Sequence, residues 1–392
     1  MPHIVVKNYK KFNTPIQKDK FNFLWFAKPL KNAKEELVAV EYENHKFLLS
    51  IKDKNSEIVI KSDKTTRISP STIIKKAIVN FCELAKCEII RSNISNIDEK
   101  HLKKSEEFLK TIDFFEKSFP KNKEVWIEIG FGSGRHLLYQ AKQNPDIMFI
   151  GIEIHKPSIE QVLKQIEIQK LRNIYVIDYD ARLFLEFVPS NIVGKIFVHF
   201  PVPWDKKPHR RVISKKFIEE AKRVLKLDGV LELRTDSKNY FDYSLELFLE
   251  QKKVKLEVTK NIEPPIVSKY EDRWLRLNKD IYDIRMINIE KSEPLKIDFD
   301  FEFKKEYNLE NIVKNFDTKP KVFDDFFVHF EKLYQIDSDR YLIKISFGNF
   351  DRPEHKYLLI TKNKIEYFPK KPVLSRGNIK AHKKIEEILN GK

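Results

Sequence analysis

The middle of the chain, residues 121–289, alternates short apolar runs with longer amphipathic segments. The runs with the length and composition of buried strands are 125–129, 148–154, 174–177, 195–200 and 230–233. The segments with apolar residues at helical spacing are 158–169, 215–225 and 240–251. Strands that alternate with helices predict βαβ crossovers. We therefore expect an α/β domain with a doubly wound, mostly parallel sheet and helices on both faces.

Both flanking regions have a different pattern: they are rich in short strand-like runs, and a helical segment follows these runs. In residues 1–120 the strand-like runs are 37–42, 46–51 and 57–60, and the helical segments are 71–90 and 99–115. In residues 290–392 the strand-like runs are 297–303, 325–333, 341–347, 357–361 and 364–367, and the helical segment is 379–389. We expect a smaller α+β extension at each end of the central domain. The five residues from His45 resemble the five from His355, which suggests a duplicated unit.

The net charge of the chain indicates which classes of binding partner it favours. Lys and Arg number 74 against 58 Asp and Glu, so the formal net charge is +16. Such a surplus favours polyanions, nucleic acid first and an anionic membrane second. No run approaches the ~18 apolar residues of a membrane helix, and the N-terminus lacks a signal-peptide pattern. We expect a soluble cytoplasmic protein that binds no membrane. The two cysteines match no common metal motif, so no metal is expected.

A glycine-rich turn follows the first strand predicted for the central domain. Gly130, Gly132 and Gly134 let the backbone turn sharply and approach a ligand without Cβ interference. Arg135 replaces the last glycine of the dinucleotide pattern, which argues against NAD. Glu128, two positions before the first glycine, would repel a pyrophosphate but suits a cationic nucleotide ligand. S-adenosylmethionine carries a sulfonium, an ammonium and no phosphate, and it fits this turn.

Two further acidic residues follow the next predicted strands. Glu153 ends the second strand, where a βαβ nucleotide fold reaches the ribose diol; the alternative is a solvated strand end. Asp180 precedes Ala181 after the third strand and could accept a hydrogen bond from the adenine amino group. The alternative for Asp180 is a helix N-cap, and one carboxylate can serve both purposes.

A basic loop follows the fourth strand. Pro201 and Pro203 enclose Val202 and stiffen the loop, and Trp204 supplies a flat face. Residues 205–226 contain nine Lys and Arg against three Asp and Glu, a local charge of +6. Basic and aromatic residues at the substrate edge of an α/β sheet indicate a nucleic-acid site, although a run of charges is often only a solvated face.

The central region resembles the bacterial tRNA (guanine-N7-)-methyltransferase family over residues 124–287. The matching stretches are 128–134, 149–155, 180–181, 200–211, 235–236 with Tyr240, and 268–273. The resemblance implies a Rossmann-like class I methyltransferase fold and S-adenosylmethionine as donor, with S-adenosylhomocysteine as product. It also implies methylation of guanine-46 in the variable loop of tRNA.

Carried over by position, the family's sites fall on named residues of this chain. The cofactor set is Glu128, Gly130, Gly132, Gly134, Glu153, Asp180 and Ala181. The substrate set is Val202, Trp204, Lys206, His209, Arg210, Thr235, Asp236 and Glu271, and the catalytic candidates among them are Asp236 and Thr235.

The chain departs from the family at two positions. Val202 stands where the family has an aspartate that has been regarded as catalytic, and Lys238 stands where it tends to have a glutamate. Guanine N7 has a free lone pair and no proton, so methylation needs no general base, and orientation alone can contribute ~7–11 kcal/mol. An acid at position 202 would hold the Watson–Crick edge of the guanine. We expect Asp236 or Glu271 to provide that contact instead.

Other interpretations stay open from the sequence. The same fold could methylate a different RNA base, which Val202 favours, or the chain could be a non-catalytic RNA-binding relative. A dehydrogenase is a remote alternative because the third glycine of its motif is missing. The expected macromolecular partner is tRNA, and the protein is expected to be a monomer or a homodimer.

Overall fold

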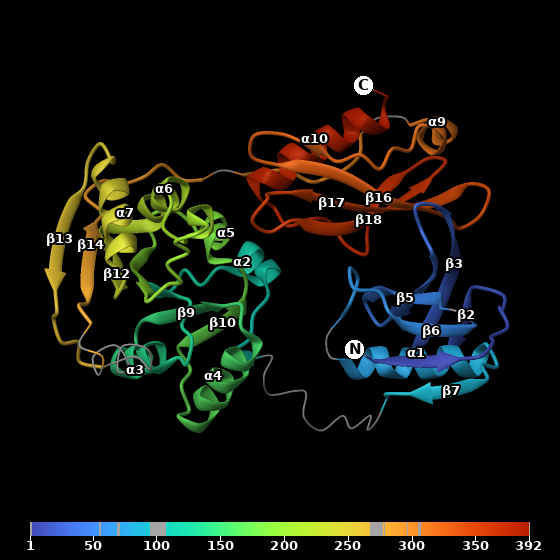
Figure 1. Cartoon of the computed structure of the whole chain (residues 1–392), viewed down its shortest axis with the longest axis horizontal. Coiled ribbons are helices and arrows are strands. Elements are labelled where there is room, and N and C mark those ends of the chain that lie inside the picture. Colours follow the sequence, from blue (N-terminus) through green and yellow to red (C-terminus); the bar gives the residue numbers. More distant parts are fainter. Residues whose placement is uncertain are drawn as a thin grey trace. The chain divides into compact units, whose positions relative to one another are not determined.

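The computed structural model describes residues 2–54, 56–68, 71–94, 107–266, 277, 279–295, 297–304 and 307–391. The chain divides into two compact units (Figure 1). Lys103–Asp298 form the central unit, and Met1–Leu102 together with Phe299–Lys392 form the flanking unit. The N- and C-terminal regions, which the sequence predicts as separate extensions, therefore belong to one unit.

The central unit contains one seven-stranded sheet with the order β10-β9-β8-β11-β12-β14-β13. The strands are β8 (Val125–Ile129), β9 (Met148–Glu153), β10 (Ile174–Asp178), β11 (Val193–His199), β12 (Leu225–Thr235), β13 (Lys255–Lys260) and β14 (Tyr282–Ile287). β8 to β12 pair in parallel, whereas β14 is antiparallel to both of its neighbours. This confirms the predicted doubly wound, mostly parallel sheet.

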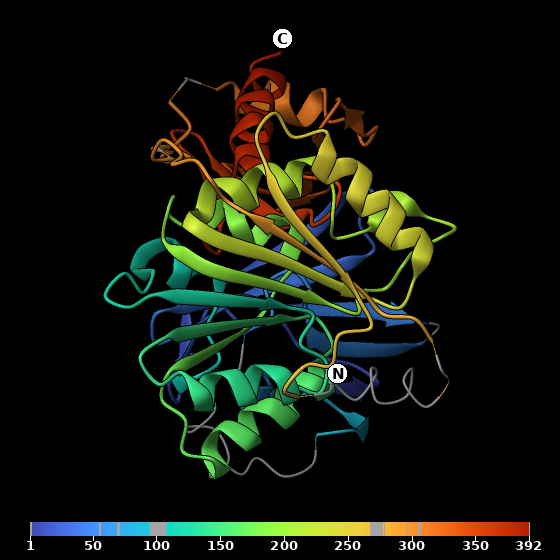
Figure 2. The same cartoon turned by 90° about the vertical axis from the view of Figure 1, so that its left-hand side faces the viewer.

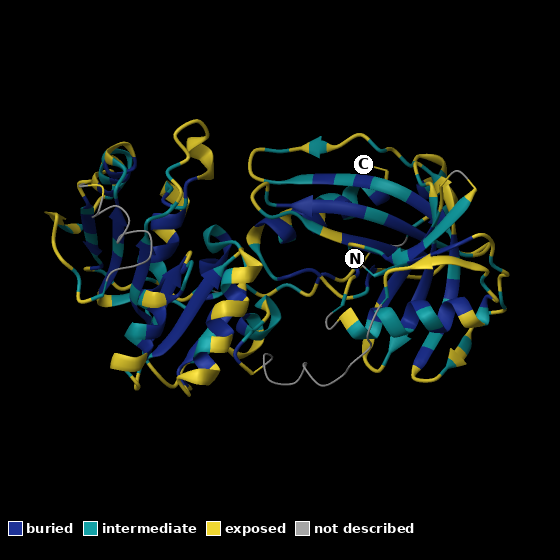
Figure 3. Ribbon diagram, turned by 60° about the horizontal axis from the view of Figure 1, so that its bottom comes forward, coloured by how far each residue is buried: buried dark blue, intermediate teal, exposed yellow. Residues whose placement is uncertain are grey.

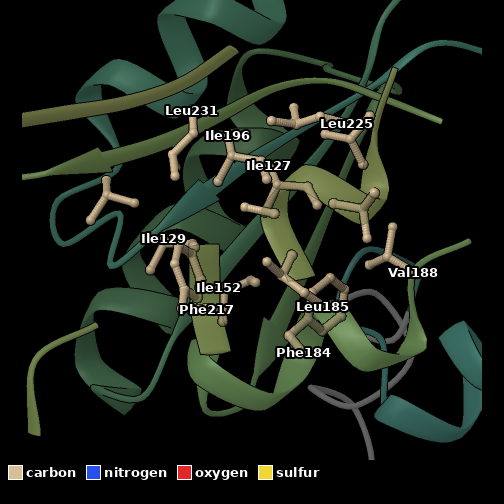
Figure 4. Close-up of a cluster of buried hydrophobic side chains, with 14 of the residues drawn as sticks. Ile127, Ile129, Ile152, Phe184, Leu185, Val188, Ile196, Phe217, Leu225 and Leu231 are labelled. Carbon is tan, nitrogen blue, oxygen red and sulfur yellow. The ribbon is translucent and has the colours of Figure 1, made fainter. Parts of the chain in front are cut away.

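Helices cover both faces of this sheet (Figure 2). One face carries α3 (Arg135–Gln143) and α4 (Lys156–Ile168); the other carries α2 (Ile112–Ser118), α5 (Ala181–Phe184), α6 (Lys215–Val224) and α7 (Lys238–Leu249). Short 3-10 turns span Leu185–Phe187 and Pro208–Arg210. Successive strand residues point to opposite faces, so Ile127 and Ile129 pack beneath α6 while Trp126 packs toward α3. Figure 4 shows the larger of the two buried clusters.

The flanking unit is built on a twelve-stranded antiparallel sheet. Ten strands follow the order β19-β18-β17-β16-β3-β4-β5-β6-β1-β7; β15 pairs with β16, and β2 with β3. In the N-terminal region the strands are β1 (His3–Val6), β2 (Ile16–Lys18), β3 (Phe21–Lys31), β4 (Glu35–Tyr42), β5 (His45–Lys54), β6 (Glu57–Ser62) and β7 (Ile89–Ser92). In the C-terminal region they are β15 (Lys321–Val322), β16 (Phe327–Gln335), β17 (Arg340–Gly348), β18 (Glu354–Thr361) and β19 (Ile365–Phe368).

The flanking unit repeats one arrangement. The N-terminal half runs β3-β4-β5-β6 and then α1 (Ser71–Leu84); the C-terminal half runs β16-β17-β18-β19 and then α10 (Arg376–Leu389). A short helix, α9 (Leu309–Lys314), precedes the C-terminal strands. The resemblance between His45 and His355 falls on the third strand of each half. The sequence echo therefore marks strands at corresponding places in the two halves.

Each half buries one face of its strands beneath its own helix, and the other faces share a cluster. Phe47 packs beneath α1 and Leu358 packs beneath α10. Trp25, Leu48 and Tyr357 belong to the shared cluster. β3 and β16 pair antiparallel and join the two halves into one sheet. Figure 3 shows the buried strand residues of this sheet in dark blue.

One predicted strand is wrong. Residues 297–303 form no strand among the residues described there, because their aromatic rings pack around a buried histidine instead of pairing with a neighbouring strand. Phe299 and Phe301 lie with ring centroids 5.3 and 5.7 Å from that of His382 on α10. Within the described part of the chain, no helix has the length and apolar character needed to cross a bilayer.

Candidate active site

The glycine-rich turn connects β8 to α3 and consists of left-handed glycines. The φ angles of Gly130, Gly132 and Gly134 are 68°, 52° and 72°. A Cβ on Gly134 would lie 2.3 Å from a methyl carbon of Val162 on α4, whereas a Cβ on Gly130 would meet nothing within 4 Å. Gly134 therefore lets the turn pack against α4, and Gly130 leaves open space beside the backbone.

Glu153, at the end of β9, holds this turn in place. Its Oε2 accepts a hydrogen bond from the Gly132 backbone N–H at 3.0 Å. Its Oε1 accepts from the backbone N–H groups of Ile154 and His155 at 2.8 and 2.9 Å. One carboxylate thus joins the glycine-rich turn to the segment that begins α4.

Asp180 caps the helix that begins at Ala181. Its Oδ1 accepts from the backbone N–H of Arg182 at 3.0 Å, and the Arg182 guanidinium bonds both carboxylate oxygens. The helix-cap interpretation of Asp180 is therefore observed. Its contact with an adenine stays a prediction.

Glu128 turns toward α3 and enters a partly buried cluster of two carboxylates and two imidazoles. It is 4% exposed, and its Oε2 accepts from His136 Nδ1 at 2.7 Å. The His136 ring lies 4.6 Å from that of His199, centroid to centroid, and His199 Nε2 bonds Glu232 Oε1 at 2.8 Å. Burial opposes ionisation of Glu232, but the His199 hydrogen bond and nearby positive charges bring its pKa below the ordinary value.

A cavity of about 180 Å³ lies at this cluster. Its lining residues are His136, Gln140, Lys195, Phe197, His199, Glu232, Arg234, Pro264, Pro265 and Ile266. The cluster was not predictable from local sequence, because its members come from α3, β8, β11 and β12. The available signal was polar residues that share a face of two mostly buried strands, at 195 and 199 on β11 and at 232 and 234 on β12.

The basic loop after β11 has two bulky residues in left-handed backbone conformations. The φ angles of Phe200 and Trp204 are 48° and 47°. Such conformations cost ~1–3 kcal/mol each and persist only where surrounding contacts enforce them. Val202, between the two prolines, is 61% exposed, and Trp204 is 36% exposed.

Arg211 makes the contacts that hold the basic loop in this conformation. Its side chain is buried, and Nε donates to the Pro203 carbonyl at 2.7 Å while Nη2 donates to Asp205 Oδ1 at 3.3 Å. The guanidinium also lies 4.4 Å from the ring centroid of Tyr243 on α7. Asn239 of the same helix donates to Asp205 Oδ1 at 2.6 Å. Arg211, noted in the sequence only as part of a basic run, therefore fastens the loop to α7.

The remaining cations of the loop face solvent. Lys206, His209 and Arg210 are exposed, and the Arg210 guanidinium lies 5.1 Å from the Trp204 ring centroid. A cation beside an exposed aromatic face provides a stacking surface for a nucleic-acid base.

Thr235 ends β12, and Asp236 follows it. Thr235 is buried, and its hydroxyl accepts from the Ser237 backbone N–H at 3.1 Å. The carboxylate of Asp236 accepts from Lys279 Nζ at 2.8 Å. Glu271, with the whole motif at 268–273, lies outside the described residues.

The predicted residues form two neighbouring groups at one edge of the sheet. The glycine-rich turn, Glu153 and Asp180 lie at the carboxyl ends of β8, β9 and β10; the basic loop, Thr235 and Asp236 lie at those of β11 and β12. Open α/β sheets bind their ligands at this edge. Across the described residues, no cluster of His, Cys, Asp and Glu side chains has the makings of a metal site.

Comparison with known proteins gives the following. A family model described as a putative methyltransferase matches residues 122–284. The tRNA (guanine-N(7)-)-methyltransferase of Wolinella succinogenes is 43% identical over 100% of this chain and 100% of its own length. That of Campylobacter fetus is 41% identical over 100% of this chain and 99% of its own. Among solved structures, an antibiotic-related methyltransferase covers 50% of this chain and 99% of its own, with 20% identity and a TM-score of 0.35.

Proposed function

The chain belongs to the tRNA (guanine-N(7)-)-methyltransferase family, and from this premise we propose that it methylates N7 of a guanine in tRNA, guanine-46 of the variable loop. The observation that carries the proposal is the 43% identity with a curated relative along both whole chains. The two neighbouring groups at the carboxyl edge of the central sheet support it, because they suit a cofactor and a nucleic acid side by side.

The cofactor group fits S-adenosylmethionine. The turn offers open space beside Gly130, Glu128 lies near the end of β8 that leads into it, and Glu153 ends the paired strand β9. Carboxylates favour a ligand with positive charge and no phosphate. When bound, S-adenosylmethionine supplies a methyl group on a positively charged sulfur. Glu153 would take the ribose hydroxyls, and Asp180 would take the adenine amino group while it caps α5.

The chain's own task is to hold the guanine. N7 needs no deprotonation, so orientation can contribute ~7–11 kcal/mol. In our proposal Asp236 binds the guanine edge in place of an acid at position 202, with Glu271 as a second candidate. Val202 and Thr235 border this site, Trp204 and Arg210 stack on a base, and Lys206 and His209 bind phosphate. We place this activity in the cytoplasm; a monomeric or homodimeric state stays a prediction.

The test is transfer of a labelled methyl group from S-adenosylmethionine to unmodified tRNA, followed by nucleoside identification. We expect 7-methylguanosine, and no incorporation into tRNA that carries 7-deazaguanosine at position 46, because that base lacks the accepting nitrogen. A different methylated base would overturn the proposal and support the same fold with another target, which Val202 favours. Wild-type turnover in both Asp236→Ala and Glu271→Ala would disprove the relocated guanine anchor.

A further inference from the structure

Four lysines gather on one face of the flanking unit. β5 and β6 pair with Ser50 opposite Lys61. Strand alternation therefore places Lys52, Lys54 and Lys61 on the face that α1 does not cover. Lys64 follows in the next turn. We call Lys52, Lys54, Lys61 and Lys64 the lysine patch.

The lysine patch has no carboxylate partner within the part of the chain that the structure describes. No ion pair or side-chain hydrogen bond joins any of its four ammonium groups to the described residues. Lys52 and Lys61 are half-buried, whereas Lys54 and Lys64 are exposed. Burial lowers the pKa of Lys61, and the positive charges of Lys54, Lys52 and Lys64 lower it further. Like charges held together on a sheet destabilise it, and an external anion would relieve this repulsion.

The nearby carboxylates are already engaged. Both oxygens of Glu57 bond Arg91, at 2.8 and 2.6 Å. Asp63 accepts from the backbone N–H groups of the turn that follows it. Glu35 attracts Lys61, but it already accepts from Lys332 and from Tyr334, at 2.6 and 2.8 Å. Charge balance at the lysine patch would therefore have to come from outside these residues.

In the C-terminal half of the same unit, a carboxylate neutralises the cationic groups on the sheet. There Glu331 bonds Lys344 at 2.9 Å and lies 3.6 Å from His355. Hydrogen bonding from His355 and Lys344 outweighs burial and holds the pKa of Glu331 far below its ordinary value. These cations have a carboxylate partner on their own face, whereas no described carboxylate bonds the lysine patch.

The charge of the whole unit indicates the kind of anion. The flanking unit has 38 Lys and Arg against 27 Asp and Glu, a net charge of +11; the central unit has 36 against 31, a net charge of +5. The two units are equally long, so most of the surplus lies outside the unit that holds the candidate active site. A broad positive field with an open cluster of ammonium groups suits a polyphosphate chain.

We propose that the lysine patch binds backbone phosphates of the tRNA substrate, as a contact separate from the one at the guanine. This rests on the proposed function, because it takes tRNA as the substrate. Ammonium groups on phosphates add affinity without reading sequence. The patch therefore serves the capture of tRNA and leaves the methyl-transfer step unchanged.

The experiment uses the full-length chain with Lys52→Gln, Lys54→Gln and Lys61→Gln combined. Affinity for unmodified tRNA is measured from low to high salt, together with KM and kcat. Each lost phosphate contact reduces the slope of log affinity against log salt by ~0.7–0.9, so we expect a reduction of about two. KM for tRNA should rise at least tenfold at ~0.15 M salt, while kcat and S-adenosylmethionine affinity stay unchanged.

The matched control removes the same charge from three lysines of the same unit that have partners. Lys364, Lys371 and Lys380 pair with Glu366, Glu302 and Asp325, and their combined change to Gln should leave the salt slope at the wild-type value. Thermal unfolding confirms that both variants fold. Equal slopes in wild type, patch variant and control would overturn the proposal, as would a patch variant that loses an acidic protein partner instead of tRNA.

The two proposals fail separately. Loss of salt slope in the patch variant, with no 7-methylguanosine from wild type, would keep the phosphate contact and overturn the proposed function. Production of 7-methylguanosine by both proteins with identical salt slopes would keep the function and overturn the patch.

Discussion

The two units of this chain are equally long, but the flanking unit contains a cluster of lysines without carboxylate partners among the described residues. In the central unit, charged groups near the candidate site are bonded locally: Glu128 to His136, Glu232 to His199, and Arg234 to Asp283. In the flanking unit the lysine patch is left open. Paired groups fix positions at short range, whereas unpaired like charges create a field that acts over about a Debye length, ~8 Å at physiological salt. We infer that the central unit positions the reacting groups, whereas the lysine patch of the flanking unit attracts the anionic substrate.

The largest expected effect comes from Gly134→Ala, which tests whether the units are independent. The new Cβ would overlap Val162, and the backbone is left-handed there. Together these cost roughly 2–5 kcal/mol, which should appear as faster hydrogen exchange in the central unit alone. Gly130→Ala is the matched control: it has the same backbone strain but open space, so its cost should stay near ~1–2 kcal/mol. Equal destabilisation of both units would contradict the expectation that they unfold independently.

A smaller effect is expected from Arg211→Met, which tests whether the central unit acts by holding the basic loop in position. Loss of the bonds to Pro203 and Asp205 releases the basic loop, so kcat on tRNA should fall ~10–100-fold. Arg223→Met is the control, because that guanidinium also bonds backbone carbonyls but lies away from the loop. It should reduce thermal stability without a change in kcat. Identical kinetics in the two variants would contradict the positioning role.

The smallest effect concerns pH and the flanking unit. Burial lowers the pKa of His382, whose Nδ1 is hydrogen-bonded to the Tyr367 hydroxyl at 2.9 Å. Glu386, the Glu302 backbone and Asp300 oppose the shift, and Lys304 adds to it. The unfolded chain then binds more protons near the ordinary value of ~6.5, so the contribution of His382 to stability is full above pH ~6.5 and declines below it.

Urea unfolding of the flanking unit between pH 5 and 7.5 measures this, and the free energy of unfolding is expected to fall as the pH is lowered. His382→Gln should flatten the dependence, and His45→Gln, at an exposed position, should keep it. A wild-type profile in His382→Gln would show that other groups carry the titration.

The central strands were predictable because their signal is local. The run at 125–129 is β8 residue for residue, and the run at 148–154 exceeds β9 by one residue, since buried parallel strands appear as continuous apolar segments. The shared sheet of the flanking unit was not predictable. Its halves meet where Pro29 of β3 pairs with Tyr334 of β16, and no local pattern reports contacts between residues three hundred positions apart.

The candidate site divides in the same way. The glycine-rich turn, Glu153 and the cap at Asp180 follow from residues next to strand ends, and all lie at the predicted edge. His136 and Arg211 were missed as supporting residues because their importance depends on tertiary partners, the Glu128 carboxylate and the rings of α7. Site residues next to strand ends were predictable from the sequence, whereas the tertiary contacts that hold them in place were not.

The pairing of β3 with β16 has a consequence for biosynthesis. A ribosome delivers β3 early, yet the strand that completes its far end emerges only after the entire central unit has been translated. Until then Trp25 lacks its neighbour Phe368, and the end of β3 presents unpaired backbone groups that invite association with other chains. Premature termination would leave this edge permanently open. The sheet of the N-terminal region can therefore be completed only after the C-terminal region has been translated.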